Sequence, residues 1–117
     1  MTSWEIIETI EYSDWFDGLD FRQQLSIRER TRALEAEGPM AGRPSVDTLS
    51  GSRIRNLKEL RVSSGGAIRI LFVFDPRRRA VLLLGGDKSE GGMWNRWYPG
   101  AIRQAERIYE RHLREME

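Results

Sequence analysis

The middle of the chain concentrates positively charged side chains that could bind phosphate groups. Residues 41–100 contain eleven Arg and Lys against five Asp and Glu, whereas residues 1–40 contain four against nine. Such an excess indicates a surface for polyanions, and the planar guanidinium of arginine can hold a phosphate with two hydrogen bonds. An ordinary solvated surface would explain the same charge equally well. Four of these cations lie within or at the ends of predicted strands: Lys58, Arg61, Arg69 and Lys88.

Arg61 and Arg69 flank the sequence SSGG, which is typical of a hairpin turn. Strand pairing should then bring the two guanidinium groups together, where they repel each other unless an anion lies between them. That anion could be a bound phosphate or a carboxylate of the protein, for which Glu59 and Asp75 are the candidates. Lys58 and Arg61 are three residues apart, so an ideal strand directs them to opposite faces. Either a bulge or a strand end intervenes, or only one of the two belongs to a site.

Aromatic side chains follow the last predicted strand, just after Lys88. Trp94, Trp97 and Tyr98 lie close to Arg96 in the sequence MWNRWYPG. Exposed aromatic rings beside cations stack on unpaired bases, whereas buried rings would pack the last helix onto the sheet. We expect Trp97 in the core and Tyr98 at the site, because a phenol hydroxyl can donate to phosphate or exchange a proton. Trp94 fits either role.

Further arginines lie in predicted turns and loops. Arg77, Arg78 and Arg79 form one turn, and Arg53 and Arg55 lie in a preceding loop. Each could neutralise phosphates without reading sequence. A solvated hairpin tip or loop explains them equally well.

Several kinds of site are excluded by composition. The chain has no cysteine, which rules out disulfides, thiol catalysis and thiolate metal sites. Its single histidine, His112, cannot form a multi-histidine metal site, and we expect it at or near the surface of the last helix. The N-terminus is acidic and no apolar run approaches membrane-spanning length, so we expect a cytoplasmic protein without membrane attachment.

The spacing of apolar residues predicts one α+β domain over residues 1–117. We expect a strand at Ser3–Ile10, a helical turn at 14–16, a helix at Phe21–Glu37 capped by Asp20, and a long surface connection with the sequence GPMAGRPSVDTLSGSR. Three strands, NLKELRV, AIRILFVFD and AVLLLGGD, should form an antiparallel meander. A C-terminal helix should follow, with Pro99 in its first turn.

The order and spacing of several runs resemble one protein family. LEAEGPMAGRPSVDTLSGSRIRNLKELRV, IRILFVFDP, VLLLGGDK and AIRQAERIYERHL are together similar to the RelE/ParE superfamily of bacterial toxins, and within it to the HigB-like, phage-derived branch. The resemblance covers Trp4 to about Leu113. It implies a small antiparallel sheet, including the N-terminal strand, with helices packed on it. It also implies a type II toxin that cleaves mRNA on the ribosome without metal or cofactor, and a cognate antitoxin, usually a helix-turn-helix DNA-binding protein.

The resemblance assigns roles to the basic and aromatic residues. Metal-free cleavage requires a deprotonated 2′-hydroxyl, stabilisation of charge on the phosphorane and protonation of the leaving 5′-oxygen, and preorganised cations supply the second. The expected catalytic residues are Arg69, Lys88, Tyr98 and Arg61. The expected RNA-binding residues are Lys58, Arg53, Arg55, Arg77, Arg78, Arg79, Trp94 and Arg96.

One departure from the family pattern leaves alternatives open. Many members carry consecutive basic residues where this chain has Lys88-Ser89-Glu90. The chain could instead be a ParE-like inhibitor of DNA gyrase, or a non-catalytic remnant of the fold that binds RNA or antitoxin.

Overall fold

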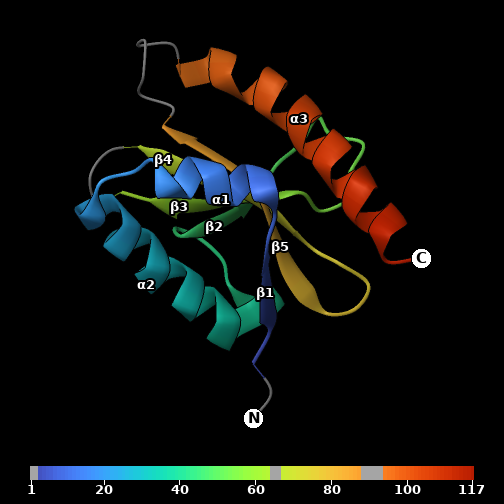
Figure 1. Cartoon of the computed structure of the whole chain (residues 1–117), viewed down its shortest axis with the longest axis horizontal. Helices are drawn as coiled ribbons and strands as arrows, with labels where there is room; N and C mark the ends of the chain where they lie inside the picture. Colours follow the sequence, from blue (N-terminus) through green and yellow to red (C-terminus); the bar gives the residue numbers. More distant parts are fainter. Residues whose placement is uncertain (1–2, 64–66, 88–93) are drawn as a thin grey trace.

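The computed structural model describes residues 3–63, 67–87 and 94–117 (Figure 1). Within these residues, five strands form one sheet in the order β1-β5-β4-β3-β2. The strands are β1 (Glu5–Glu8), β2 (Val46–Thr48), β3 (Lys58–Val62), β4 (Ile68–Phe74) and β5 (Arg79–Asp87). Neighbours from β2 to β5 are antiparallel, which confirms the predicted meander. The expectation of a wholly antiparallel sheet is wrong, because β1 joins β5 in parallel.

Helices cover both faces of this sheet. They are α1 (Ile10–Asp17), α2 (Phe21–Glu37) and α3 (Trp94–Glu115), with a short 3-10 turn η1 (Gly38–Met40) after α2. α1 and α2 pack on one face and α3 packs on the other (Figure 1). Because both faces are covered, consecutive residues Val81 to Leu84 of β5 are all buried. No helix of the described residues is long and apolar enough to cross a membrane.

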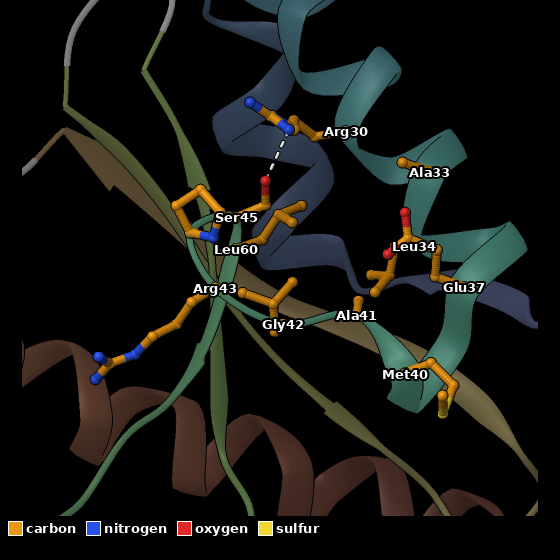
Figure 2. Close-up of a pocket in the computed structure, with 12 residues that line it drawn as sticks. Arg30, Ala33, Leu34, Glu37, Met40, Ala41, Gly42, Arg43, Ser45 and Leu60 are labelled. Atoms are coloured by element: carbon orange, nitrogen blue, oxygen red, sulfur yellow. Dashed lines mark hydrogen bonds between the residues drawn. The ribbon is translucent and has the colours of Figure 1, made fainter.

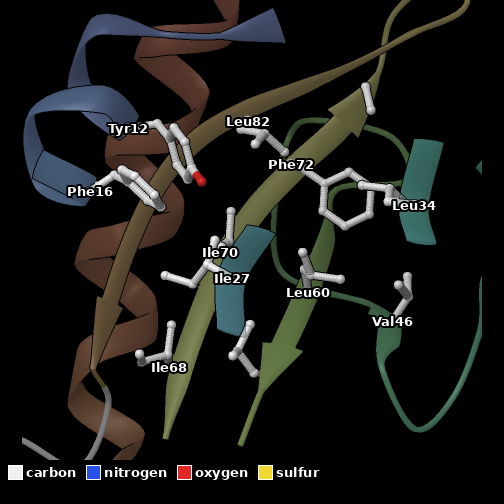
Figure 3. Packing of buried hydrophobic residues seen from close by; sticks show 12 residues of the cluster. Tyr12, Phe16, Ile27, Leu34, Val46, Leu60, Ile68, Ile70, Phe72 and Leu82 are labelled. Atoms are coloured by element: carbon white, nitrogen blue, oxygen red, sulfur yellow. The ribbon is translucent and has the colours of Figure 1, made fainter. Parts of the chain in front are cut away.

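The core is divided by the sheet into two clusters. The cluster beneath α1 and α2 gathers Tyr12, Phe16, Ile27, Leu34, Val46, Leu60, Ile68, Ile70, Phe72 and Leu82 around the central strands (Figure 3). The cluster beneath α3 is made by Leu57, Leu71, Val73, Val81, Leu83, Leu84, Ala101, Ala105 and Ile108. Strand alternation assigns neighbouring residues to opposite clusters. The same alternation decides which polar side chains of β3 and β4 can meet beside α3.

Helix α2 has the predicted bounds, because its ends are set by local signals. The Asp20 carboxylate accepts a hydrogen bond from the Gln23 backbone N–H at 2.8 Å, and the Gln23 side-chain oxygen accepts one from the Asp20 N–H at 3.2 Å. Phe21 and Leu25 lie on the outer face of this helix, since they are 78% and 50% exposed. Leu25 precedes the buried Ile27 by two residues, which is about 200° around a helix.

The N-terminal strand is shorter than predicted. It ends at Glu8, and the Thr9 hydroxyl then accepts a hydrogen bond from the Tyr12 N–H while lying 2.8 Å from the Leu82 carbonyl. Thr9 therefore caps a helix that begins at Ile10, so the predicted turn at 14–16 is the second half of α1. The expected surface connection after α2 also contains η1 and the edge strand β2, which the sequence analysis missed.

Two tryptophan rings pack on consecutive glycines of β5. A Cβ atom at Gly85 would lie 2.2 Å from the Trp15 ring, and one at Gly86 would lie 2.6 Å from Nε1 of Trp97. The two rings approach from opposite faces, Trp15 from α1 and Trp97 from α3. Helix α3 starts before Pro99, which lies in its second turn rather than its first. This early start places residues 97 and 98 beside the end of the sheet.

Candidate functional site

Arg61 and Arg69 lie directly opposite each other on β3 and β4, as their positions around SSGG predicted. The pairing of β3 with β4 is regular from Lys58 to Val62, so Glu59 and Arg61 share one face. That face also carries Leu71, which belongs to the cluster beneath α3. The two arginines therefore lie on the α3 side of the sheet, near the ends of their strands.

A carboxylate of the protein lies between these arginines. Glu59 has a side chain only 3% exposed, and its Oε2 accepts a hydrogen bond from Arg61 Nε at 3.0 Å. Its Oε1 accepts one from the Tyr98 hydroxyl at 2.6 Å and lies 3.7 Å from Arg69 Nε. Of the two carboxylates considered from sequence, Glu59 and Asp75, it is Glu59 that lies between the two arginines. This arrangement holds three predicted catalytic side chains within one cluster.

Arg69 is incompletely satisfied in this cluster. Its Nη1 donates to the Ile68 carbonyl at 3.0 Å, and its side chain is 14% exposed. Its Nε is buried and has no hydrogen-bond partner in the part of the chain that the structure describes. A buried donor without an acceptor costs about 1–3 kcal/mol. The Glu59 carboxylate, 3.7 Å from this Nε, interacts with it through charge.

A second carboxylate extends the network to the edge strand. Asp47 on β2 accepts from Arg61 Nη2 at 3.0 Å and lies 3.1 Å from Arg43. The hydrogen bond from Arg43 is the main reason that the pKa of Asp47 lies below its ordinary value, and the charge of Arg61 adds to the effect. Cations and anions thus alternate from the exposed Arg43 to the buried Glu59.

Tyr98 joins the network from the beginning of α3. Burial, and then its hydrogen bond to Glu59, raise the pKa of Tyr98 to about 12. At neutral pH the hydroxyl is therefore protonated and can act as a donor. The ring packs edge-on against Trp97, with 5.1 Å between centroids, and Trp97 packs on the second core cluster as expected. Gly86 thus helps to set the position of Tyr98, because it admits the neighbouring indole.

Lys58 does not join this cluster. Its neighbours in alternation, Leu60 and Val62, belong to the core beneath α2, and its Nζ donates to the Thr48 hydroxyl at 2.9 Å. No bulge interrupts the pairing of β3 with β4, so the odd separation of Lys58 and Arg61 does place them on opposite faces.

The predicted arginine turn lies at the far end of β4. Arg79 Nε donates to Asp75 Oδ2 at 2.9 Å, and His112 Nε2 lies 3.0 Å from the same oxygen. The expectation of a surface or half-buried His112 is wrong, because His112 is buried, with 9% exposure. These three residues tie the β4–β5 turn to the end of α3. Arg79 is thereby turned toward the protein.

Other predicted RNA contacts are also engaged with the protein. Arg77 donates to the Met116 carbonyl at 2.7 Å, and Arg78 lies over the Trp4 ring, 5.0 Å from its centroid. Arg53 donates to Glu110 at 2.7 Å across the surface of α3. Arg55 is exposed in the loop before β3. These arginines do not gather beside Arg61 and Arg69.

Two expected site residues cannot be placed beside the cluster. Lys88 lies outside the described residues, and so does the side chain of Trp94. Arg96 is exposed, and with Trp97 and Gly86 it lines a recess of about 910 Å³ at the end of β5. This recess reaches α1 at Trp15, on the opposite side of the two glycines.

A separate recess of about 440 Å³ lies between α2 and β2 (Figure 2). Arg30 donates to the Ser45 hydroxyl across it at 2.7 Å, and Leu34 and Leu60 form part of its wall. It contains none of the side chains predicted from sequence to bind RNA or catalyse cleavage. The candidate site is therefore the cluster beside α3.

Two acidic residues, Glu59 and Asp47, bind Arg61 in this cluster. Glu59 was considered as a structural partner, but Asp47 was not considered, although it also faces Arg61. One signal was available for Glu59, since a residue two positions from Arg61 must share its strand face. Glu106 on α3 had no comparable signal, because its partners Ser52 and Arg53 lie more than fifty residues away.

In the described residues, no group of three or more His, Cys, Asp or Glu is arranged to hold a metal ion. What the cluster offers is two guanidinium groups, a protonated phenol and a buried carboxylate. Guanidinium groups can bind a phosphate and stabilise added negative charge on it, and the phenol can donate a proton.

Comparisons with known proteins cover most of the chain. A family model described as phage derived protein Gp49-like matches residues 14–110. The protein named "Putative toxin HigB2" of Mycobacterium tuberculosis (strain ATCC 25618 / H37Rv) is 43% identical over 107 residues, which are 90% of this chain and 52% of that protein. "Putative toxin HigB3" of the same strain is 48% identical over 99 residues, which are 85% of this chain and 84% of that protein. The chain therefore spans about half of the first relative and most of the second.

Proposed function

The chain belongs to the phage-derived Gp49-like family, and we propose that it is a HigB-type toxin that cleaves mRNA on the ribosome. The similarity to two proteins named as toxins supports the toxin assignment. The observation that carries the proposed chemistry is the meeting of Arg61, Arg69 and Tyr98 around one buried carboxylate. These groups come from β3, β4 and α3, so the fold itself brings them together.

The proposed reaction is an attack of the RNA 2′-hydroxyl on the adjacent phosphate. The new P–O2′ bond forms as the P–O5′ bond breaks, which leaves a 2′,3′-cyclic phosphate and a free 5′-hydroxyl. Arg61 and Arg69 hold the phosphate and stabilise its added charge through the exposed parts of their side chains. Tyr98 gives its proton to the leaving 5′-oxygen. Lys88 is proposed to take the proton from the 2′-hydroxyl.

Glu59 serves as a positioning residue in this proposal. It fixes the Nε edge of Arg61 and the hydroxyl of Tyr98, while Arg61 and Arg69 keep part of their side chains exposed. When the phosphate binds, the Tyr98 hydroxyl must turn from Glu59 toward the substrate. The negative charge of Glu59 also offsets the repulsion between the two arginines before the phosphate binds.

A cognate antitoxin, of the helix-turn-helix class, is the proposed protein partner. Ribosomes and mRNA are the proposed substrate complex, which places the reaction in the cytoplasm. The exposed Arg43, which joins the network through Asp47, would contribute a sequence-independent phosphate contact.

The test is to induce the chain without its antitoxin and to map the 5′ ends of mRNA. The proposal expects growth arrest with new 5′ ends inside translated codons. Arg69→Ala should lose both effects, whereas the matched control Lys58→Ala should keep them, because Lys58 lies on the other face of β3. Circular dichroism must show that both variants are folded.

Other results would refute the proposal. Growth arrest with DNA breaks and intact mRNA would identify a gyrase inhibitor. No arrest by the folded parent protein would identify a non-catalytic remnant. Full activity of folded Arg69→Ala would leave the toxin assignment standing and overturn the site.

A further inference from the structure

Helix α3 carries a line of arginines on the side that faces away from the sheet (Figure 1). The members of this arginine stripe are all exposed, and they are Arg96, Arg103, Arg107 and Arg114. A helix turns by about 100° per residue, so these positions lie within about 20° of one line along its surface. The stripe is about 27 Å long, because each residue adds a rise of about 1.5 Å. It contains none of the residues of the candidate site.

The charge of this stripe is available to a ligand. Within residues 3–63, 67–87 and 94–117, the side chains of Arg107 and Arg114 make no hydrogen bond or ion pair. Glu110, which lies between them in the sequence, is held by Arg53 at 2.7 Å. That ion pair also adds a further cation, 70% exposed, to this side of α3. An anion that approaches the stripe therefore finds guanidinium groups that are not yet paired.

The stripe lies on a helix whose position is fixed from two sides. Both carboxylate oxygens of Glu11 on α1 accept hydrogen bonds from Arg111, at 2.6 and 2.7 Å. On the opposite side of α3, Ile108 is buried in the second core cluster. Arg107 and Arg114 line a recess of about 310 Å³ between Glu11 and α3. These two cations thus lie beside a hollow that an anion can enter, and the helix does not have to move to form it.

The composition of this surface favours a nucleic acid over a protein partner. Among the described residues, the exposed large apolar side chains are Ile10, Phe21, Leu25 and Met40, and none of them lies on α3. Protein–protein interfaces usually centre on apolar and aromatic side chains, whereas interfaces with nucleic acids are more polar and more positively charged. Helix α3 contains no lysine, and the planar guanidinium of arginine can bind a phosphate with two hydrogen bonds.

The same surface favours a double strand over a single strand. Single strands are usually held by aromatic rings on which their bases stack. The described aromatic rings of α3 are engaged elsewhere: Trp97 and Tyr109 pack against the second core cluster, and Tyr98 donates a hydrogen bond to Glu59. The backbone phosphates of a duplex need no ring for stacking, because arginines neutralise them without contacting the bases.

We propose that the arginine stripe binds the phosphate backbone of a double-stranded nucleic acid without reading its sequence. This inference goes beyond the proposed cleavage, because it concerns binding at a surface separate from the candidate site. Only Arg96 of the stripe was among the RNA-binding residues expected from the sequence. RNA and DNA helices offer the same phosphodiester chemistry, so the test compares both sources.

The test is binding of short duplexes to the purified chain, followed by fluorescence anisotropy at several salt concentrations. One probe is an RNA duplex with 2′-O-methyl groups, which cannot be cleaved by attack of a 2′-hydroxyl, and the other is a DNA duplex of the same sequence. We expect the logarithm of the affinity to fall linearly with the logarithm of the salt concentration. The duplex that binds more tightly identifies the source of the phosphates. If neither duplex binds, the proposal is overturned.

Variants separate the stripe from the general charge of the protein. Arg107→Ala combined with Arg114→Ala should weaken duplex binding by about tenfold and reduce the salt slope by about two. The matched control combines Arg22→Ala with Arg32→Ala, which removes the same charge from exposed positions of α2 on the other face of the sheet, and should bind like the parent. If the double variant of α3 does not fold, each single variant should reduce the salt slope by about one. Folded α3 variants that bind like the parent, or a control that loses as much affinity, would overturn the proposal.

Failure of this inference can be distinguished from failure of the proposed function. Duplex binding that depends on Arg107 and Arg114, without any mRNA cleavage in cells, would support the stripe and refute the nuclease. Cleavage of mRNA by a chain that binds neither duplex would support the nuclease and overturn the stripe.

Discussion

Replacing Gly86 with alanine tests how the sheet positions the candidate site. The added Cβ would lie 2.6 Å from Nε1 of Trp97 and 2.8 Å from two further ring atoms. These distances are shorter than any real contact, and the indole is a rigid group packed against the second core cluster. The ring and the first turns of α3 must therefore move. Overpacking of this kind costs about 1–3 kcal/mol of unfolding free energy.

The expected change in melting temperature follows from the size of the chain. For 117 residues, each kcal/mol corresponds to about 3–6 °C, between the values for smaller and larger domains. Gly86→Ala should therefore lower the midpoint by roughly 3–18 °C. Thermal and urea unfolding followed by circular dichroism provide the measurement.

A double-mutant cycle identifies the cause. In a Trp97→Ala background the ring is absent, so the additional loss caused by Gly86→Ala should shrink by about 0.5–3 kcal/mol. Gly100→Ala is the matched control, since its Cβ meets no atom within 4 Å in an exposed part of α3. That variant should gain about 0.5–1 kcal/mol. The reasoning is refuted if Gly86→Ala is as stable as the parent, or if its cost is the same without the indole.

Three further predictions concern buried groups. Glu59→Gln should lower the pKa of Tyr98 from about 12 toward its ordinary value of 10 without reaching it, because burial remains; a phenol titration that does not move would contradict this. Burial alone would raise the pKa of Asp75, but hydrogen bonds from His112 and Arg79 hold it below its ordinary value of 3.8. Ionised Asp75 therefore stabilises the folded protein fully above pH 3.8, and this stabilisation is lost as the pH falls through the pKa of Asp75 in the folded state. Asp75→Asn should reduce the change in urea midpoint between about pH 5 and pH 2, and an unchanged acid dependence would refute it. Ile27→Ala should lose about 2–5 kcal/mol in urea unfolding, and a loss below about 1 kcal/mol would contradict its complete burial.

Local signals explain which elements could be predicted from the sequence. Helix α2 runs from Phe21 to Glu37 as expected, since an Asp cap and a terminal glycine define its ends. The edge strand β2 was missed because three residues are too few to show alternation, and its pairing with β3 supplies the hydrogen bonds. The early start of α3 was missed because Pro99 was read as a first-turn residue. Pairing with β3 rather than a local signal decides the bounds of β2.

In the candidate site, too, the features that have a local sequence signal could be predicted and those that depend on distant residues could not. The opposition of Arg61 and Arg69 followed from the short turn between them, because a hairpin fixes its register locally. The burial of His112 could not be predicted, because its partner Asp75 follows β4 at a distance of 37 residues along the chain and no local pattern connects the two. The hydrogen bond from Tyr98 to Glu59 could not be predicted either, because the two residues are 39 positions apart.

The parallel pairing of β1 with β5 has a consequence for the timing of folding. Its partners, such as Ile7 and Val81, are separated by most of the chain, so the sheet cannot close until β5 has been synthesised. Non-local pairings of this kind slow folding, because a long loop must be ordered before the contact forms. Residue 98 of the candidate site is made later still. A nascent chain therefore lacks the assembled arginine cluster until residue 98 has left the ribosome, because Tyr98 donates the hydrogen bond that completes the cluster at Glu59.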